Sequence, residues 1–248
     1  MRSPQVIYVD AVGTLFGVRG SVGEQYAKVA LNFGVCLEPK LVNQAFYQSF
    51  QAASNIAFPN LPQSEIAIAE YQWWYSLAVQ TFTKTGDLDK FSDFDGFFKN
   101  LYAYFATAEP WGVYEDTLPA LDTWQKQGIS LGVLSNFDSR IYPVMEALGL
   151  KSYFSSITIS TESGAAKPDA LIFEVALAKH QLQQTPDLAW HIGDSFSEDY
   201  LGASEVGINA LWLNRDRNMP NDLAGQAANT IDKLTSVVLK IDIEHPLI

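Results

Sequence analysis

The feature that most restricts the fold of this chain is a short apolar segment that recurs along it and ends each time in polar residues. Such segments, rich in β-branched side chains, are typical of strands buried on both faces of a sheet. Five of them occur: 6–9 before Asp10, 129–134 before Ser135, 157–159 before Ser160, 188–192 before Gly193 and Asp194, and 208–213. The pattern predicts five buried strands.

Helix-length segments separate these predicted strands. Residues 116–127 and 138–148 each precede a glycine, and residues 169–180 follow a Lys-Pro pair. Aspartate at the start and glycine after the last turn are ordinary signals for the ends of a helix. Strands that alternate with helices predict right-handed crossovers, and hence an α/β fold with a doubly wound parallel sheet. Ligands of such sheets bind beyond the carboxyl ends of the strands.

The alternation stops between residues 18 and 109, where helical patterns occur without a convincing strand. Residues 21–24 resemble a capping box, and Pro39 suits the first turn of a second helix. The predicted helices cover 21–34, 39–53, 64–82 and 95–107, and aromatic side chains are expected to fill the core between them: Trp73, Trp74, Tyr75, Phe97 and Phe98.

The length of the chain also favours two unequal parts. Its 248 residues come close to the size at which a single core stops growing. We therefore expect an α/β core domain from residues 1–17 and 110–248, with a helical cap domain, residues 18–109, inserted after the first strand.

The charge of the chain restricts its partners. Its formal net charge is -12 and its sequence pI is near 4.6. Such a surface repels phosphate backbones and anionic lipids, and no basic stripe compensates for this repulsion. We therefore expect neither nucleic acid nor a membrane surface as a partner, but a small anionic substrate held by a few local cations or a metal.

Two further features bear on the compartment. The single cysteine, Cys36, cannot form an internal disulfide, which fits a reducing environment. The apolar run at residues 6–9 is far shorter than a signal segment or a membrane span. These features predict a soluble, cytoplasmic protein.

Polar residues at the ends of the predicted strands should meet at one edge of the sheet. Asp10 follows the first strand, Ser135 and Asn136 follow the second, and Asp194 precedes Asp199 by five positions after the fourth. Taken alone, an aspartate here is most often a turn residue, Ser135 a helix cap and Lys167 a solvated loop residue. Asp194 and Asp199 could also cap a helix starting near Ser197. None of these simpler explanations accounts for all four sites together.

In their order and spacing these residues resemble the four motifs of the haloacid dehalogenase superfamily. The motifs are the stretch from Asp10 to Leu15, the strand ending in Ser135 and Asn136, Lys167 with Pro168, and Gly193-Asp194 with Asp199. The resemblance covers essentially the whole chain, including the inserted cap. Within the superfamily, residues 72–82 and the pair Phe58-Pro59 resemble the group named haloacid dehalogenase-like hydrolase domain-containing protein 3.

Three clustered carboxylates are costly unless a cation neutralises them, and a hard set of oxygen ligands suits Mg²⁺. The resemblance implies that Asp10 is the nucleophile and, with Asp194, binds the metal directly. It further implies metal contacts from the backbone carbonyl of Val12 and from the outer ligand Asp199.

The resemblance also assigns residues to the substrate. It implies that Thr14, Ser135 and Asn136 bind the phosphoryl group, while Lys167 supplies positive charge where negative charge builds up. Arg19 lies where the chain passes from the first motif into the cap, and it could bind a substrate anion, as an arginine does in dehalogenases. It could equally well be an exposed surface residue.

Position 12 departs from the phosphatases of this superfamily. They carry an aspartate there, which protonates the leaving oxygen and then activates water; this chain has Val12. Valine has no titratable group, so general acid/base catalysis from this position, typically worth about 10² to 10⁴ in rate, is absent.

Three interpretations remain open, in this order of preference. The first is a Mg²⁺-dependent phosphohydrolase that forms an aspartyl intermediate on Asp10 and takes its proton from elsewhere. The second is a metal-independent 2-haloacid dehalogenase, against which the acidic pair Asp194 and Asp199 argues. The third is a non-catalytic module that binds a phosphorylated metabolite or a protein.

Overall fold

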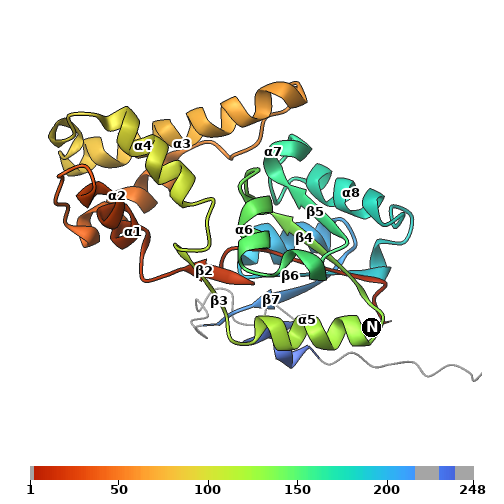
Figure 1. Cartoon of the computed structure of the whole chain (residues 1–248). Coiled ribbons are helices and arrows are strands. Elements are labelled where there is room, and N and C mark those ends of the chain that lie inside the picture. Colours follow the sequence, from red (N-terminus) through yellow and green to blue (C-terminus); the bar gives the residue numbers. More distant parts are fainter. Residues whose placement is uncertain (1–2, 216–228, 238–248) are drawn as a thin grey trace, which may run out of the picture.

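The computed structural model describes residues 3–215 and 229–237. Within these ranges six strands, all parallel, form one sheet in the order β5-β4-β1-β6-β7-β8 (Figure 1). Their bounds are β1 Val6–Val9, β4 Ser130–Ser135, β5 Ser156–Ile159, β6 Ala189–Gly193, β7 Asn209–Leu213 and β8 Thr230–Ile231. The predicted doubly wound parallel α/β sheet is confirmed, and the strand order reverses beside β1.

Helices cover both faces of this sheet. On one face α5 and α6 pack against the strands, and on the other face α8, η4 and α9 do so. The bounds are α5 Thr117–Lys126, α6 Ile141–Ala147, α7 Ser160–Ser163, α8 Ala170–Lys179 and α9 Gly202–Glu205, with a π-helical turn η4 Phe196–Leu201 and 3-10 turns η2 Lys151–Tyr153, η3 Pro186–Leu188 and η5 Leu234–Ser236.

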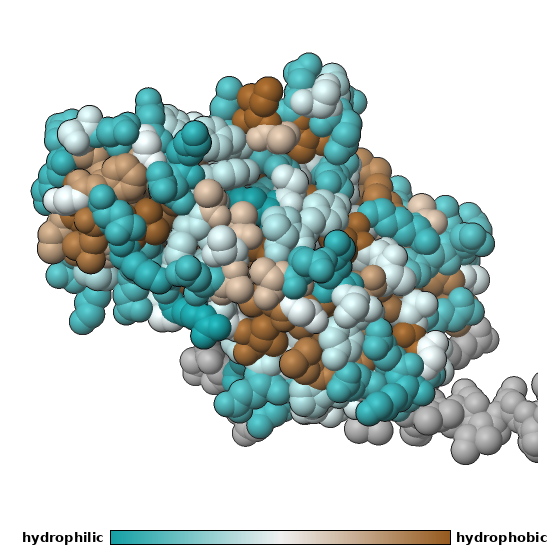
Figure 2. Space-filling view, in the orientation of Figure 1, coloured by the Kyte–Doolittle hydropathy of each residue, from teal (hydrophilic) through white to brown (hydrophobic). Residues whose placement is uncertain are grey.

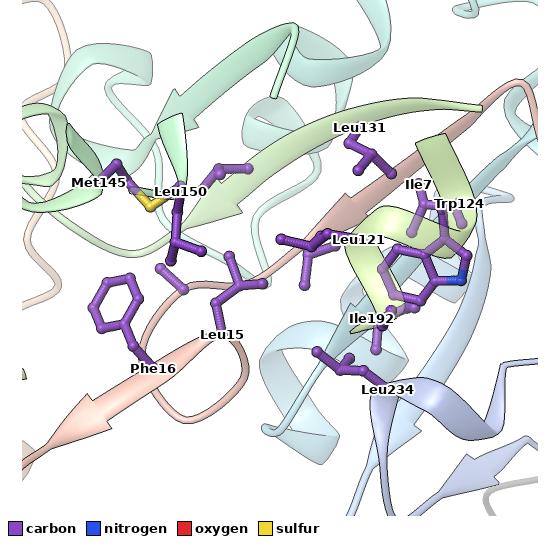
Figure 3. Packing of buried hydrophobic residues seen from close by; sticks show 14 of the residues in the cluster. Ile7, Leu15, Phe16, Leu121, Trp124, Leu131, Met145, Leu150, Ile192 and Leu234 are labelled. Carbon is purple, nitrogen blue, oxygen red and sulfur yellow. The ribbon is translucent and has the colours of Figure 1, made fainter. Parts of the chain in front are cut away.

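The central strand shows why the apolar runs are continuous rather than alternating. Ile7 and Val9 point into the cluster beneath α5, while Val6 and Tyr8 point into the cluster beneath α8, and all four are fully buried. Figure 3 shows Ile7 beside Leu121 and Trp124 of α5 in the first of these clusters. Burial on both faces requires an apolar side chain at every position of the strand.

The sequence pattern missed three short strands. β8 adds a sixth strand to the five that were predicted, and it contains two residues. β2, Phe16–Val18, pairs antiparallel with β3, Trp111–Val113. This ribbon joins the sheet domain to the inserted helices. Neither of its strands was predicted from the sequence. Runs of two or three residues are too short to show a period.

Four helices make up the helical insertion, as predicted. Their bounds are α1 Val22–Leu31, α2 Pro39–Ala52, α3 Gln63–Thr85 and α4 Phe94–Tyr104, with the 3-10 turn η1 Leu88–Lys90. They enclose an apolar cluster of their own, separate from the two that flank the sheet. Figure 1 shows them to one side of the sheet, with α3 extending toward α7.

Local signals set the ends of several helices. Ser21 Oγ accepts a hydrogen bond from the Glu24 backbone N at 3.2 Å, so the predicted cap of α1 is confirmed. Asp169 caps α8 in the same way. The predicted helix over 138–148 begins only at Ile141, because the Asp138 carboxylate instead holds the backbone and side chain of Arg140.

The aromatic residues of the insertion only partly fill its core. Phe97 and Phe98 are buried there, as expected. Trp73, Trp74 and Tyr75 are half-buried and pack against that cluster from outside. The expectation that all five are core residues is therefore corrected for these three, of which Trp74 reaches the sheet domain by donating a hydrogen bond to Asp138.

Hydrophilic side chains cover much of the face shown in Figure 2. On the face shown in Figure 2, apolar side chains form separate groups with hydrophilic residues between them. Isolated exposed apolar residues such as Leu31 are ordinary for a globular protein. In the described part of the chain, no helix is both long and apolar enough to span a membrane.

Candidate active site at the carboxyl edge of the sheet

Three neighbouring strands bring the predicted residues together. Asp10 follows β1, Ser135 ends β4 on one side of it, and Asp194 follows β6 on the other side. The Asp10 backbone N donates a hydrogen bond to Ile192 O at 2.9 Å, which extends the sheet by one residue. Because parallel strands end at the same edge, these polar groups meet there.

Lys167 is the cation of this cluster. It is 1% exposed, and its Nζ donates to Asp10 Oδ1 at 2.7 Å, to Asp199 Oδ1 at 2.5 Å and to the Leu134 carbonyl oxygen at 3.1 Å. Burial by itself lowers the pKa of a lysine, but the two carboxylates outweigh it and hold the pKa of Lys167 above its ordinary value. The side chain therefore stays charged.

Asn136 positions that lysine. Its Oδ1 accepts from the Lys167 backbone N at 2.7 Å, and its Nδ2 donates to the Lys167 carbonyl oxygen at 3.0 Å. Nδ2 also donates to Glu198 Oε2 at 3.2 Å. Sequence reasoning missed Glu198, although it stands next to Asp199. Burial raises the pKa of Glu198.

Three carboxylates face this single lysine. One oxygen each of Asp10, Asp194 and Asp199 lies within 4.8 Å of the others. Burial, together with the charge of Asp199, raises the pKa of Asp10 despite Lys167. Asp194 opens onto the pocket, yet the protein around it restricts its hydration; with the charges of Asp10 and Asp199 this raises the pKa of Asp194 to about 7. One lysine does not balance three carboxylates. A hard divalent cation such as Mg²⁺ would supply the missing positive charge.

Asp199 has the opposite behaviour. Burial raises its pKa, but Lys167 and the hydrogen bond to His191 together hold the pKa of Asp199 below its ordinary value. His191 Nε2 lies 2.8 Å from Asp199 Oδ1, and the Ser195 backbone N donates to Oδ2 at 3.0 Å. Both oxygens of Asp199 are thus engaged by protein groups, whereas the Asp194 side chain is exposed to the pocket.

His191 was expected to have a structural role, and the structure gives it a specific one. It is fully buried in β6, where it contacts the carboxylate that holds Lys167. The signal in the sequence was a single polar residue within an otherwise apolar strand. Its role is to fix Asp199 rather than to face the pocket.

Two glycines allow the aspartates to sit this close to the backbone. Gly13 has φ +92°, and a Cβ there would lie 2.4 Å from Asp194 Oδ2. A Cβ on Gly193 would lie 2.1 Å from Asp199 Cγ. Any larger residue would displace a carboxylate at either position. Thr14 is fully buried, and its Oγ1 donates to Asp194 Oδ1 at 3.4 Å, so the structure places it behind Asp194.

These groups line a pocket of about 360 Å³ between the sheet edge and the helical insertion. From the sheet side come Asp10, Val12, Ser135, Asn136, Ala166, Lys167, Asp194, Ser195, Glu198 and Asp199, and from the insertion come Tyr47, Phe50, Ala53, Ser54, Asn55, Ile56 and Trp73. Among the predicted site residues that the structure describes, Thr14 and Arg19 do not line it.

Arg19 lies outside this pocket. Its side chain is exposed, and its backbone is fixed by a hydrogen bond from Arg19 N to Pro110 O at 2.8 Å. The guanidinium that reaches the junction of insertion and sheet domain is that of Arg140, which binds Asp138 through Nε at 2.9 Å and Nη2 at 2.6 Å. Sequence reasoning missed Arg140, although it follows Asn136 by only four positions.

Comparison with protein-family models agrees with the fold and the site. Residues 4–207 match the model of the haloacid dehalogenase-like hydrolases. The chain therefore belongs to the haloacid dehalogenase-like hydrolase family and is a hydrolase by family. This confirms the membership that the four motifs predicted.

Among curated proteins, the chain is similar to haloacid dehalogenase-like hydrolase domain-containing protein 3. The protein of that name from Bos taurus is 36% identical over 204 residues, which is 82% of this chain and 79% of the relative. The Homo sapiens protein is 33% identical over the same shares. The predicted resemblance to this group is confirmed.

Solved structures with low sequence identity share the fold. A dehalogenase has a TM-score of 0.69 at 17% identity, covering 95% of this chain and 96% of its own. The hydrolase YfnB from Bacillus subtilis, bound to magnesium, has a TM-score of 0.69 at 15% identity, covering 95% of this chain and 97% of its own.

Proposed function

We propose that this protein is a Mg²⁺-dependent phosphohydrolase that acts on a small phosphorylated molecule through a covalent intermediate on Asp10. The observation that carries the proposal is the charge of the pocket. Three carboxylates with oxygens within 4.8 Å of one another face one buried lysine, so the cluster lacks a cation. The acidic pair Asp194 and Asp199 argues against a 2-haloacid dehalogenase that works without a metal.

The metal would be held by Asp10 and Asp194, with the backbone carbonyl of Val12 as a further ligand and Asp199 in the outer shell. The engagement of both Asp199 oxygens by Lys167, His191 and Ser195 supports its outer position. When bound, the metal supplies positive charge for the phosphoryl oxygens. The magnesium bound to the structurally similar YfnB is consistent with this assignment.

In the first step an oxygen of Asp10 attacks the phosphorus, and the bond to the leaving oxygen breaks with its electron pair on that oxygen. The Lys167 ammonium, 2.7 Å from Asp10, opposes the rise in the pKa of Asp10 that burial causes, and it aligns the carboxylate. The Ser135 hydroxyl, at the end of β4, would donate to a phosphoryl oxygen, which is the electrostatic help that such transfers need.

In the second step water attacks the phosphorus of the aspartyl phosphate and releases inorganic phosphate and free Asp10. With Val12 in place of an aspartate, no side chain at this position protonates the leaving oxygen or activates the water. The proposed chemistry therefore favours leaving groups that are stable as anions. Alkyl esters should react slowly.

The experiment is a hydrolysis screen on the purified chain with and without Mg²⁺, using aryl phosphates, an acyl phosphate and 2-haloacids. We expect Mg²⁺-dependent release of phosphate, lowered at least about 10³-fold by Asp10→Asn because the nucleophile is lost. The exposed Asp89, far along the chain in the insertion, supplies the matched control Asp89→Asn, which should keep full activity.

Calorimetry of Mg²⁺ binding tests the metal site independently of turnover. Asp194→Asn should abolish binding, and Asp89→Asn should not. Undiminished binding in Asp194→Asn contradicts the metal assignment. Halide release that resists EDTA would support the dehalogenase interpretation, and phosphate-ligand binding without any turnover would support a non-catalytic module.

A further inference from the structure

A second cavity adjoins the polar pocket. Its volume is about 220 Å³, and it lies where α1, α2, α3 and α4 meet the loop after β4. Of the 17 described residues that line it, ten are aromatic: Tyr26, Phe46, Tyr47, Phe50, Trp74, Phe98, Tyr102, Phe105, Trp111 and Phe137. The remaining residues are aliphatic except for Asn136 and Arg140. This cavity is therefore built to hold an apolar group.

The two cavities share part of their walls. The residues common to both are Val12, Tyr47, Phe50, Ile56 and Asn136. Val12, two residues after the nucleophile Asp10, thus stands at the boundary between the polar pocket and the aromatic cavity. A phosphoryl group attacked by Asp10 would leave its ester substituent beside Val12, facing the aromatic cavity.

The arginine of this cavity does not make it an anion site. The Arg140 guanidinium lies 4.0 Å from the ring centre of Tyr102 and 4.8 Å from that of Trp74. Asp138 binds it with both oxygens and also accepts from Trp74 Nε1 at 2.6 Å. Arg140 is the only charged side chain among the described residues that line the cavity, and its charge is balanced within the protein. A second anion would find no free cation there.

We propose, on the basis of the proposed function, that this cavity binds the leaving group and that the substrates are phosphate monoesters of an uncharged phenol with one or two rings. A cavity of about 150 Å³ lined by apolar side chains holds benzene, so the volume here suits a ring of that size or somewhat larger. Aromatic walls favour a ring over an alkyl chain through edge and face contacts.

The loss of the acid at position 12 and the shape of the cavity lead to the same class of substrate. A phenolic leaving group departs as a stable anion without protonation, which Val12 cannot supply. The same valine provides an apolar wall where a carboxylate would stand, and a ring packs against it without leaving a charge unsolvated. The substitution therefore acts as a determinant of specificity as well as a lost catalytic group.

Two non-hydrolysable ligands test this proposal by calorimetry in the presence of Mg²⁺. Benzylphosphonate and ethylphosphonate carry the same anionic head, and they differ only in the ring. The wild type should bind benzylphosphonate at least about 10-fold more tightly, given the apolar area that the ring buries. Equal affinities, or no binding of either ligand, overturn the proposal without reference to any variant.

A substitution that fills the aromatic cavity provides a second test. Leu101 is 2% exposed and lines the aromatic cavity but not the polar pocket, so Leu101→Trp should remove the preference for benzylphosphonate and leave the affinity for ethylphosphonate unchanged. Leu31, on α1, is 62% exposed, and Leu31→Trp is the matched control that should keep the preference. A preference that survives in Leu101→Trp contradicts the assignment. A separate measurement tests the proposed phosphohydrolase activity. If that activity is wrong, no ester or acyl phosphate will release phosphate in a Mg²⁺-dependent manner.

Discussion

At the scale of single residues, the site depends on which charges are paired. Lys167 pairs with Asp10 and Asp199 inside the protein, and Asn136 holds its backbone. Lys167 only partly offsets the charge around Asp194, so restricted hydration and the neighbouring carboxylates raise the pKa of Asp194 to about 7. One additional divalent cation, as proposed for this site, would relieve this imbalance.

A substitution at position 12 tests the chemistry of the leaving group. Val12→Asp should restore a proton donor and raise alkyl phosphate turnover by part of the about 10² to 10⁴ that general acid catalysis contributes. Aryl phosphates should gain less, because their leaving groups need no proton. The measurement is kcat/KM across esters of graded leaving-group pKa.

The control for this substitution is Val12→Asn, which has a similar shape and polarity but no acid. Folding and Mg²⁺ binding must match the wild type in both variants. A wild type whose rates are independent of leaving-group pKa, with no gain in Val12→Asp, would show that another group already donates the proton.

At the scale of elements, one helix of the insertion is fixed to the sheet domain by a buried glutamate. Glu70 of α3 is fully buried, and its carboxylate accepts from the backbone N of Ser139 at 2.9 Å and from Thr161 Oγ1 at 2.7 Å, besides the Ser139 hydroxyl. Ser139 precedes α6, and Thr161 lies in α7. The insertion is therefore attached through α3 as well as through the β2–β3 ribbon.

Removing this carboxylate should loosen the second attachment. Glu70→Gln places an amide donor against groups that also donate, which should cost about 1 to 3 kcal/mol of folding stability. For a chain of this size, that lowers Tm by about 2 to 12 °C. Thermal unfolding measures the effect.

Glu65 lies on the same helix and is exposed, so Glu65→Gln is the matched control and should leave Tm unchanged. Hydrogen exchange should also speed up in the first half of α3 in Glu70→Gln alone. An unchanged Tm and exchange pattern would show that α3 is held to the sheet domain by other contacts.

At the scale of the whole molecule, the net charge opposes the proposed substrate. A formal charge of -12 repels a phosphate ester until the ester reaches the pocket. The local cation, Lys167, is buried at the bottom of that pocket and adds little to the field outside.

Salt should therefore speed up capture of the substrate. At 0.15 M ionic strength charges separated by more than about 8 Å are screened, so kcat/KM should rise about 2- to 10-fold between 0.01 and 0.15 M at fixed free Mg²⁺. NaCl and KCl should act alike if screening is the cause. A kcat/KM that falls as salt is added would mean that a local positive field guides the substrate.

The sequence alone determined the strand-and-helix alternation and the family. Continuous apolar runs such as residues 6–9 can only be buried on both faces, and that burial in turn requires a parallel sheet with covering helices. The positions of Asp10, Ser135 and Asp194 followed, because the ends of adjacent parallel strands must meet. Glycine and aspartate signals also placed most helices to within a few residues.

Only the tertiary structure decided how these residues are paired and which others join them. The sequence gives no sign of the contacts that Glu70 and Arg140 make with distant segments. Glu70 of α3 binds Thr161, and the rings of α3 and α4 stack on Arg140. His191 stands out as a polar residue in an apolar strand, but only the structure shows that it binds Asp199. The aromatic cavity likewise needs four helices and a loop to be brought together. Local patterns report the period and the ends of an element, whereas contacts between distant segments depend on how those elements pack.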